Sequence, residues 1–152
     1  MMNIRSLIKI SLLVFILVGG AIQLLPVQRT NPPGETEVPA SAEIRTILRQ
    51  ACYDCHSNET VWPWYSRVAP ISWLVAYDVR EGREEMNFST WNRYSSEQKA
   101  DKLKEIIEVV SEGEMPPRIY LPLHPEARLS AEAVAALRAW SESVPAQEKS
   151  PS

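Results

Sequence analysis

The chain has 152 residues, of which 45% are hydrophobic and 23% are charged, which is ordinary for one folded domain with short additional segments. Its net charge of −3 and pI of about 5.5 argue against a protein that binds nucleic acid, because such proteins carry a basic surface. Twelve prolines against five glycines is an unusual ratio, and the prolines fall after the apolar N-terminus and in the bends between helical patterns.

The N-terminal segment is basic at its start and then apolar. Arg5 and Lys9 precede a run from Ile10 to Leu25, and counting two apolar residues before Lys9 brings it within the roughly 17–25 residues that span a bilayer. Since no A-x-A cleavage site follows, we expect residues 1–27 to form an uncleaved signal anchor, with a cleaved signal peptide as the alternative. Either would place the rest of the chain outside the cytoplasm, because positive charges before a span are retained inside.

The polar segments on either side of the central region are expected to lie outside the fold. Residues 28–40 contain Pro32, Pro33 and Gly34 and are predicted to be a flexible, extended linker. The folded domain is predicted to cover residues 41–144. The tail at residues 145–152 is polar and has the composition of a disordered segment.

Helical periodicity marks two segments in the first half of the domain. The first begins at Ser41, a favourable N-cap, and its apolar positions lead into Cys52. The second starts at Pro70, which suits the first turn of a helix, and ends in the charged run at residues 80–85. Its helically spaced apolar residues predict a stripe that faces the core, made of Ile71, Leu74, Val75 and Val79.

Two further helical segments follow in the second half. Ser95 and Gln98 have the spacing of a capping box, and Gly113 is a plausible end of that helix. Ser130 is the predicted cap of the last helix. No segment alternates with period two for long enough to form a strand, so the predicted class is all-α. The inward-facing residues should include Leu103, Ile106, Ile107, Val110, Val134, Leu137 and Trp140, and we expect the other aromatics, Trp62, Trp64, Tyr65, Trp73 and Trp91, in the core as well.

Residues 52–56 read Cys-Tyr-Asp-Cys-His and hold both cysteines of the chain. In such a segment each thiol adds across one haem vinyl group, and one turn of chain spaces Cys52 and Cys55 to the two vinyls. His56 is then held beside the iron as its proximal ligand. The pattern is a recognised signal of c-type attachment and predicts one covalently bound haem c.

Three other uses of the two thiols stay open at this point. A structural zinc site needs four ligands, and the chain adds only His56 and His124 to the cysteines, with Cys55 and His56 awkwardly adjacent. A thioredoxin-like dithiol belongs in a βαβ unit, which the helical pattern does not provide. A structural disulfide across so short a loop would stabilise the fold little.

A six-coordinate haem needs a second axial ligand, for which the chain offers three candidates. Met115 is the expected distal ligand, because Pro116 and Pro117 stiffen its loop and lower the entropy lost on coordination. His124 is the alternative and would give bis-His ligation with a lower reduction potential. Met86 ends a charged helix, where packing is the simpler interpretation.

The motifs CHSNET, WPWYS, REGRE, MPP and LHPEA occur in this order and resemble the bacterial haem-binding domain family. Members of that family are small, exported and cytochrome c-like, and the resemblance covers about residues 40–144. It implies covalent haem c on Cys52 and Cys55 with His56 as axial ligand, and it supports Met115 as the second. It brings no defined partner or reaction, since the family is named mainly for its haem.

We therefore expect a small cytochrome c-like helical domain around a covalently attached haem. An N-terminal anchor should hold it on the periplasmic or extracytoplasmic face of the bacterial cytoplasmic membrane. The expected function is one-electron transfer between membrane or periplasmic redox proteins, with His/Met ligation and no catalysis. The alternative is a haem-based sensor whose distal ligand a gas molecule displaces. A peroxidase-like enzyme ranks last, because no distal His–Arg pair stands at a recognisable spacing.

Overall fold

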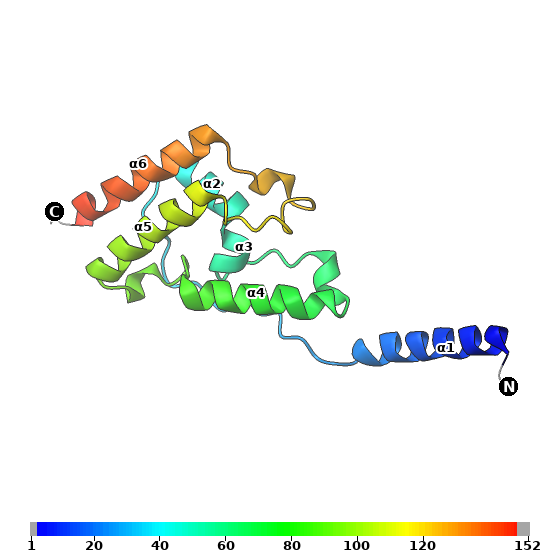
Figure 1. Ribbon diagram of the computed structural model, residues 1–152. Helices are drawn as coiled ribbons and strands as arrows, with labels where there is room; N and C mark the ends of the chain where they lie inside the picture. The colour runs from blue at the N-terminus through cyan, green and yellow to red at the C-terminus, as the bar shows by residue number, and fades with distance from the viewer. Residues whose placement is uncertain (1–2, 149–152) are drawn as a thin grey trace. The chain divides into compact units, whose positions relative to one another are not determined.

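The computed structural model describes residues 3–148, and every regular element in this range is a helix, which confirms the predicted all-α class. Outside the helices, an isolated parallel bridge joins Thr36 and Thr90. The elements, labelled in Figure 1 where there is room, are α1 (Ile4–Ile22), α2 (Ala42–Ala51), α3 (Tyr53–His56), η1 (Trp64–Arg67), α4 (Ile71–Glu85), η2 (Trp91–Arg93), α5 (Ser96–Glu112), η3 (Pro125–Ala127) and α6 (Ala131–Glu148), where η marks a 3₁₀-helix.

The chain forms two compact units that do not follow the sequence order. The first unit combines the N-terminal residues up to Thr30 with residues 62–78, and so holds α1, η1 and the first half of α4. The second unit combines residues 31–61 with the chain from Val79 onward, and holds α2, α3, α5 and α6.

In the first unit, α1 is the helix predicted as a signal anchor. It has 19 residues, its apolar window has a mean hydropathy of 2.0, and none of that window is buried. A helix of this length and composition can cross a bilayer, and a signal sequence has the same properties. Just after the helix, the Gln23 side chain donates to the Ala69 carbonyl at 3.1 Å and accepts from the Ala69 amide at 2.9 Å.

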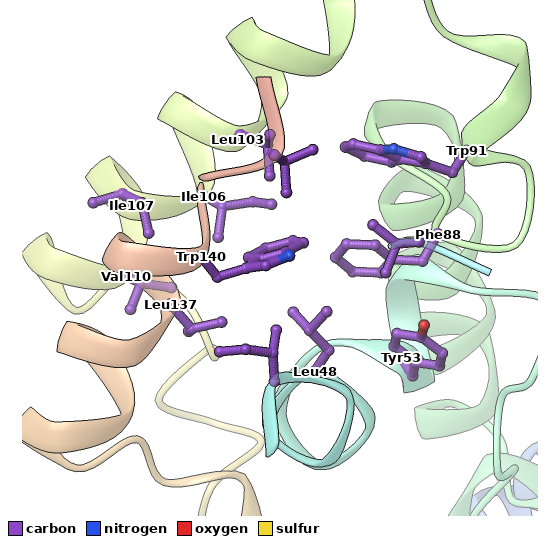
Figure 2. Packing of buried hydrophobic residues seen from close by; sticks show 13 residues of the cluster. Leu48, Tyr53, Phe88, Trp91, Leu103, Ile106, Ile107, Val110, Leu137 and Trp140 are labelled. Carbon is purple, nitrogen blue, oxygen red and sulfur yellow. The ribbon is translucent and has the colours of Figure 1, made fainter. Parts of the chain in front are cut away.

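The core of the second unit lies among α2, α5 and α6 and the segment that follows α4. α5 and α6 run antiparallel side by side, while α2 packs against α3, η3 and α6 (Figure 1). Figure 2 shows the apolar side chains that these elements bring together. Phe88 stacks on Tyr53 with ring centroids 5.2 Å apart, and Trp91 stacks on Phe88 at 6.3 Å. The largest fully buried apolar side chains here are Phe88, Leu48, Leu103, Leu137, Val38 and Val144.

The helix ends have the caps that the sequence predicts. The Ser41 hydroxyl accepts from Ile44 N at 3.3 Å, and Ser95 and Gln98 form a reciprocal capping box. α5 ends at Gly113, whose φ of 72° lies in the left-handed region that glycine adopts without strain. The Ser130 hydroxyl accepts from Ala133 N at 3.2 Å at the start of α6.

The prediction of a flexible linker at residues 28–40 is wrong from residue 31 onward. The segment is extended, but Val38 is only 1% exposed, and Glu35 N donates to Ser89 O at 2.7 Å. A buried apolar side chain and backbone hydrogen bonds hold it to the second unit. At the other end, α6 continues to Glu148, so the first four residues of the predicted disordered tail are helical, and the other four lie outside the described residues.

The predicted core stripe of α4 is also wrong in its first two turns. Ile71 is 49% exposed and Leu74 48% exposed, whereas Val79 is buried as predicted. Of the aromatics expected in the core, Trp91 and Trp140 are buried, but Trp64 and Trp73 are exposed.

Candidate haem-binding site

The Cys-x-x-Cys-His segment is one tight turn between α2 and α4. Cys52 ends α2, its amide donating to Leu48 O at 2.9 Å, and it also begins α3. The His56 amide then donates back to Cys52 O at 2.9 Å, which closes the turn. The two thiols and the imidazole thus lie within one helical turn, with Cys52 at the N-cap of α3 and Cys55 and His56 in it.

His56 is oriented by a backbone carbonyl at the end of α4. Its Nδ1 lies 3.2 Å from Met86 O, and since a carbonyl only accepts, Nδ1 carries the hydrogen and Nε2 is left with its lone pair. Burial lowers the pKa of His56, and the hydrogen bond to Met86 opposes that shift in part. The imidazole is therefore held neutral, which is the form that binds a metal.

A cavity of about 130 Å³ in the second unit adjoins His56. Its α5 wall is mostly apolar but includes Lys102 and Glu105, and three sulfur-containing residues, Cys52, Met86 and Met115, also line the cavity. Ala51, Cys52, His56, Glu85, Met86, Lys102, Glu105, Ile106, Val109, Val110, Met115, Pro116 and Leu129 line it. A neutral imidazole, a thiol and a thioether thus meet around one apolar space.

A protein-family model for the haem-binding domain matches residues 17–143. The chain belongs to the haem-binding domain family. No curated protein and no solved structure matches it. The family match supports a haem cofactor for the chain, and it extends into α1 and across the segment predicted to be a linker.

The side chains at the cavity fit a haem. His56 offers Nε2, Met115 offers a thioether, and α5 offers an apolar wall for the porphyrin. The cavity is smaller than the roughly 300–1,000 Å³ of pockets that enclose a whole ligand, so it does not by itself enclose a haem. The zinc alternative lacks ligands, because among the described residues no group of three or more His, Cys, Asp or Glu side chains is placed to hold a metal ion.

The two cysteines differ in their surroundings, and neither is in a disulfide. Cys52 lines the cavity, where burial raises the pKa of its thiol to about 12, with Cys55 adding to the shift. Cys55 does not line the cavity and lies against α4 at Gly82, where an added Cβ would come within 2.7 Å of the Cys55 carbonyl oxygen. Only glycine allows α3 and α4 to approach so closely, which explains the glycine within the REGRE motif.

The residues that follow His56 hold the turn in place. The Ser57 hydroxyl donates to Tyr53 O at 2.7 Å, and the Thr60 hydroxyl donates to Asp54 O at 2.8 Å. Arg83 from α4 donates to Ser57 O at 2.7 Å and to Thr60 Oγ1 at 2.8 Å. The CHSNET motif and the second arginine of REGRE therefore form one hydrogen-bonded support for the Cys-x-x-Cys-His turn.

Of the three candidates for the distal ligand, the structure separates His124 from the two methionines, Met86 and Met115, which both line the cavity. Met115 lines the cavity and is 40% exposed, and its amide donates to Val109 O at 3.2 Å. His124 is not among the cavity-lining residues. Its ring stacks on Tyr120 at 3.9 Å, and its Nδ1 lies 3.2 Å from Glu126 Oε1. The Tyr120 hydroxyl in turn donates to Asp54 Oδ2 at 2.7 Å.

Sequence reasoning missed two positions that shape this site. The carbonyl of Met86 orients His56, but a backbone group leaves no trace in residue identity. Gly82 was seen only as part of a charged run, although a single glycine within a helix often signals a close approach of another element. The glycine could therefore have been recognised from the sequence, whereas the contact of the Met86 carbonyl with His56 is visible only in the three-dimensional structure.

Proposed function

We propose that the chain is an exported monohaem c-type cytochrome that transfers single electrons. The observation that carries the proposal is the orientation of His56, whose Nδ1 lies 3.2 Å from Met86 O beside the cavity that Cys52 and Met115 also line. A hydrogen-bonded Nδ1 with Nε2 directed to the metal is the usual arrangement of an axial histidine. The family supplies the haem.

Each residue has a defined role in this proposal. The thiols of Cys52 and Cys55 attach the haem as thioethers, His56 is the proximal ligand, and Met115 is the distal ligand. When bound, the haem supplies an iron that cycles between the ferric and ferrous states. Two protein ligands fill both axial positions, so the proposed role is that of a carrier rather than an enzyme. The thioether of Met115 raises the reduction potential relative to bis-His ligation.

The proposed location follows from α1. Its length and hydropathy suit a signal anchor, and Arg5 and Lys9 at its start favour retention of the N-terminus inside. The haem domain then lies on the periplasmic side of the cytoplasmic membrane. Its electron donor and acceptor would be membrane or periplasmic redox proteins, and the anchor raises the effective concentration of the domain near them.

Covalent attachment is tested on the purified, exported chain. After extraction with acidified organic solvent, the haem should stay with the protein, and its pyridine haemochrome spectrum should be that of a haem with both vinyl groups saturated. In the Cys52→Ser/Cys55→Ser variant the haem should pass into the solvent. Haem that is extractable from the wild-type chain would contradict the c-type proposal but not haem binding itself.

The distal ligand is tested with three matched variants. The wild-type ferric spectrum should contain the weak far-red band of methionine–iron ligation. Met115→Ala should abolish it, whereas Met86→Ala and His124→Ala should keep it. Loss of the band in Met86→Ala alone would identify the other methionine on the cavity wall as the ligand.

The exposure of Met115 favours a second candidate function. A thioether that is 40% exposed on a loop is a weak ligand that a small molecule can displace. The protein would then be a haem-based sensor for carbon monoxide or nitric oxide. Rapid uptake of carbon monoxide by the ferrous wild-type protein, at a rate that Met115→Ala does not increase, would favour this function over electron transfer.

A further inference from the structure

The first unit exposes an apolar surface with three aromatic side chains. Large apolar side chains scattered singly are normal on a protein surface, but these belong to one segment of only 14 residues. We name the set the aromatic surface; its members and their exposed fractions are Trp64 at 76%, Val68 at 45%, Ile71 at 49%, Trp73 at 38%, Leu74 at 48% and Tyr77 at 51%.

Four of these residues form one face of α4, which is inverted relative to a helix of a water-soluble domain. At 100° per residue, Trp73, Tyr77, Leu74 and Ile71 follow one another around the helix within about 160°. On the other side of α4, Ser72 is only 3% exposed. A helix in water hides its apolar face and exposes its polar one, so the exposed face here is suited to an apolar surrounding.

The aromatic surface is joined to the end of the membrane-spanning helix. The amide group of Gln23, one residue beyond α1, makes two hydrogen bonds to the backbone of Ala69, at 3.1 Å and 2.9 Å. Arg29 donates to Ser66 O at 3.0 Å. Both attachments lie within the first unit, so they hold Ser66 and Ala69, in the middle of residues 64–77, beside the C-terminal end of α1.

The charge of the first unit also suits a membrane surface. Two of its four basic residues, Arg5 and Lys9, lie at the start of α1 and would stay on the inner side. The part that follows α1 contains Arg29, Arg67 and one acidic residue, Asp78. Both Arg29 and Arg67 are exposed. Exposed arginines beside apolar and aromatic side chains are the composition of segments that lie on anionic phospholipid.

We propose that the aromatic surface rests in the headgroup region of the phospholipid bilayer that α1 spans. Trp64, Trp73 and Tyr77 lie at the headgroup level, as aromatic side chains do at the ends of membrane spans, while Ile71 and Leu74 reach the acyl boundary. The chain therefore contacts the membrane twice, through a spanning helix and through an interfacial segment. This inference rests on the proposed role of α1 as an uncleaved anchor.

The test uses the full chain in vesicles of mixed zwitterionic and anionic phospholipid. Tryptophan fluorescence is compared in plain vesicles and in vesicles whose lipids are brominated either near the headgroup or near the end of the acyl chain. We expect quenching mainly by the lipid brominated near the headgroup. That quenching should fall about twofold or more in Trp64→Phe/Trp73→Phe, because interfacial indoles are its source. In the matched control Trp91→Phe, which alters a buried indole of the second unit, it should not change.

Flotation of the same samples separates this inference from the anchor. A chain that floats with the vesicles but shows no quenching keeps the anchor and overturns the interfacial surface. Equal quenching in wild type and in Trp64→Phe/Trp73→Phe overturns it too, since the aromatic surface would then face water or another protein. A chain that does not float with the vesicles overturns both proposals. Circular dichroism should show unchanged helix content in the double variant, because both substituted side chains are exposed.

Discussion

The two units differ in how many of their apolar residues they bury: the second unit has an apolar core, although Val61, Ile119 and Leu123 are exposed on it. In that core Leu48, Phe88 and Leu137 are fully inaccessible to water, whereas the first unit exposes Trp64 and Leu74. Their charges are opposite as well. The first unit has four basic residues and one acidic residue, while the second has twelve basic and eighteen acidic residues. An overall net charge of −3 therefore conceals a basic unit and a strongly acidic one.

This contrast teaches that helical periodicity does not identify what an apolar stripe faces. The stripes of α4 and α5 look alike in sequence, yet Leu103 and Ile106 of α5 are buried by protein, while Ile71 and Leu74 of α4 are exposed. An apolar stripe on a helix can be buried either in a protein core or in lipid, and its periodicity is the same in both cases. Net charge counted within each unit also differs, since it is positive in the first unit and negative in the second.

The largest difference should appear when a leucine is truncated in each unit. Leu137→Ala removes a side chain that is 0% exposed and should lower the free energy of unfolding by about 2–5 kcal/mol, because it leaves a cavity. Leu74→Ala truncates a side chain that is 48% exposed, and should cost less than about 1 kcal/mol. Denaturant unfolding of the full chain in detergent, followed by circular dichroism, measures both. Similar losses would remove the contrast between the units.

A methyl group added to a glycine should have the next largest effect. In Gly82→Ala the new Cβ would lie 2.7 Å from Cys55 O, so the backbone of the Cys-x-x-Cys-His turn must move. This shift should lower the free energy of unfolding by about 1–3 kcal/mol. Gly20→Ala in α1 is the matched control, since nothing lies within 4 Å of its Cβ position. Denaturant unfolding and the visible spectrum of the haem report the change. An unperturbed Gly82→Ala protein would show that α3 and α4 can separate without consequence.

Two buried tryptophans of the second unit should differ by about one hydrogen bond. Trp140 Nε1 donates to Pro39 O at 2.9 Å, while Trp91 Nε1 has no partner among the described residues. Trp140→Phe removes this hydrogen bond, whereas Trp91→Phe removes none, so Trp140→Phe should destabilise the fold by about 1 kcal/mol more. Both indoles are buried, so the two substitutions should lose similar packing energy, and the difference between them reports mainly the hydrogen bond. A larger loss for Trp91→Phe would indicate that its Nε1 is bound to water.

The sequence predicted most of the second unit because its local signals agree with its burial. Ser41, Ser95 and Gly113 act as caps and stops in the positions expected, and the stripes of α5 and α6 face the core. Cys52 and His56 lie one helical turn apart, as their spacing in the sequence implies, while their role towards a haem stays a prediction. These predictions depend on residues close together in sequence.

The remainder depends on contacts between distant residues. The prolines and acidic residues around Val38 predict a linker, because a single apolar residue among them gives no local signal of burial. The structure nevertheless buries Val38. The orientation of His56 depends on a carbonyl 30 residues away, and the attachment of Gln23 to Ala69 spans 46 residues. No local pattern encodes such pairs. The side of α4 that faces protein was likewise undetermined by its own periodicity.

The smallest expected effect is a pH dependence that belongs to the second unit alone. Burial holds the pKa of His56 below the value of about 6.5 that it has in the unfolded chain. Above about pH 6.5 the imidazole is neutral in both states and adds no slope. As the pH falls below this value, the unfolded chain binds the proton first, so stability decreases. Iron ligation acts in the same direction, because it too requires the neutral imidazole.

Denaturant midpoints of the full chain, measured between about pH 7.5 and pH 5.5, should therefore decline on acidification, above the range in which most carboxylates titrate. His56→Gln should flatten this decline, since the amide does not titrate. The quenching of Trp64 and Trp73 by brominated lipid should stay constant over the same range, because the first unit contains no histidine. If the denaturant midpoint of His56→Gln still declines on acidification, another group takes up the proton. The acid sensitivity would then not arise from the Cys-x-x-Cys-His turn.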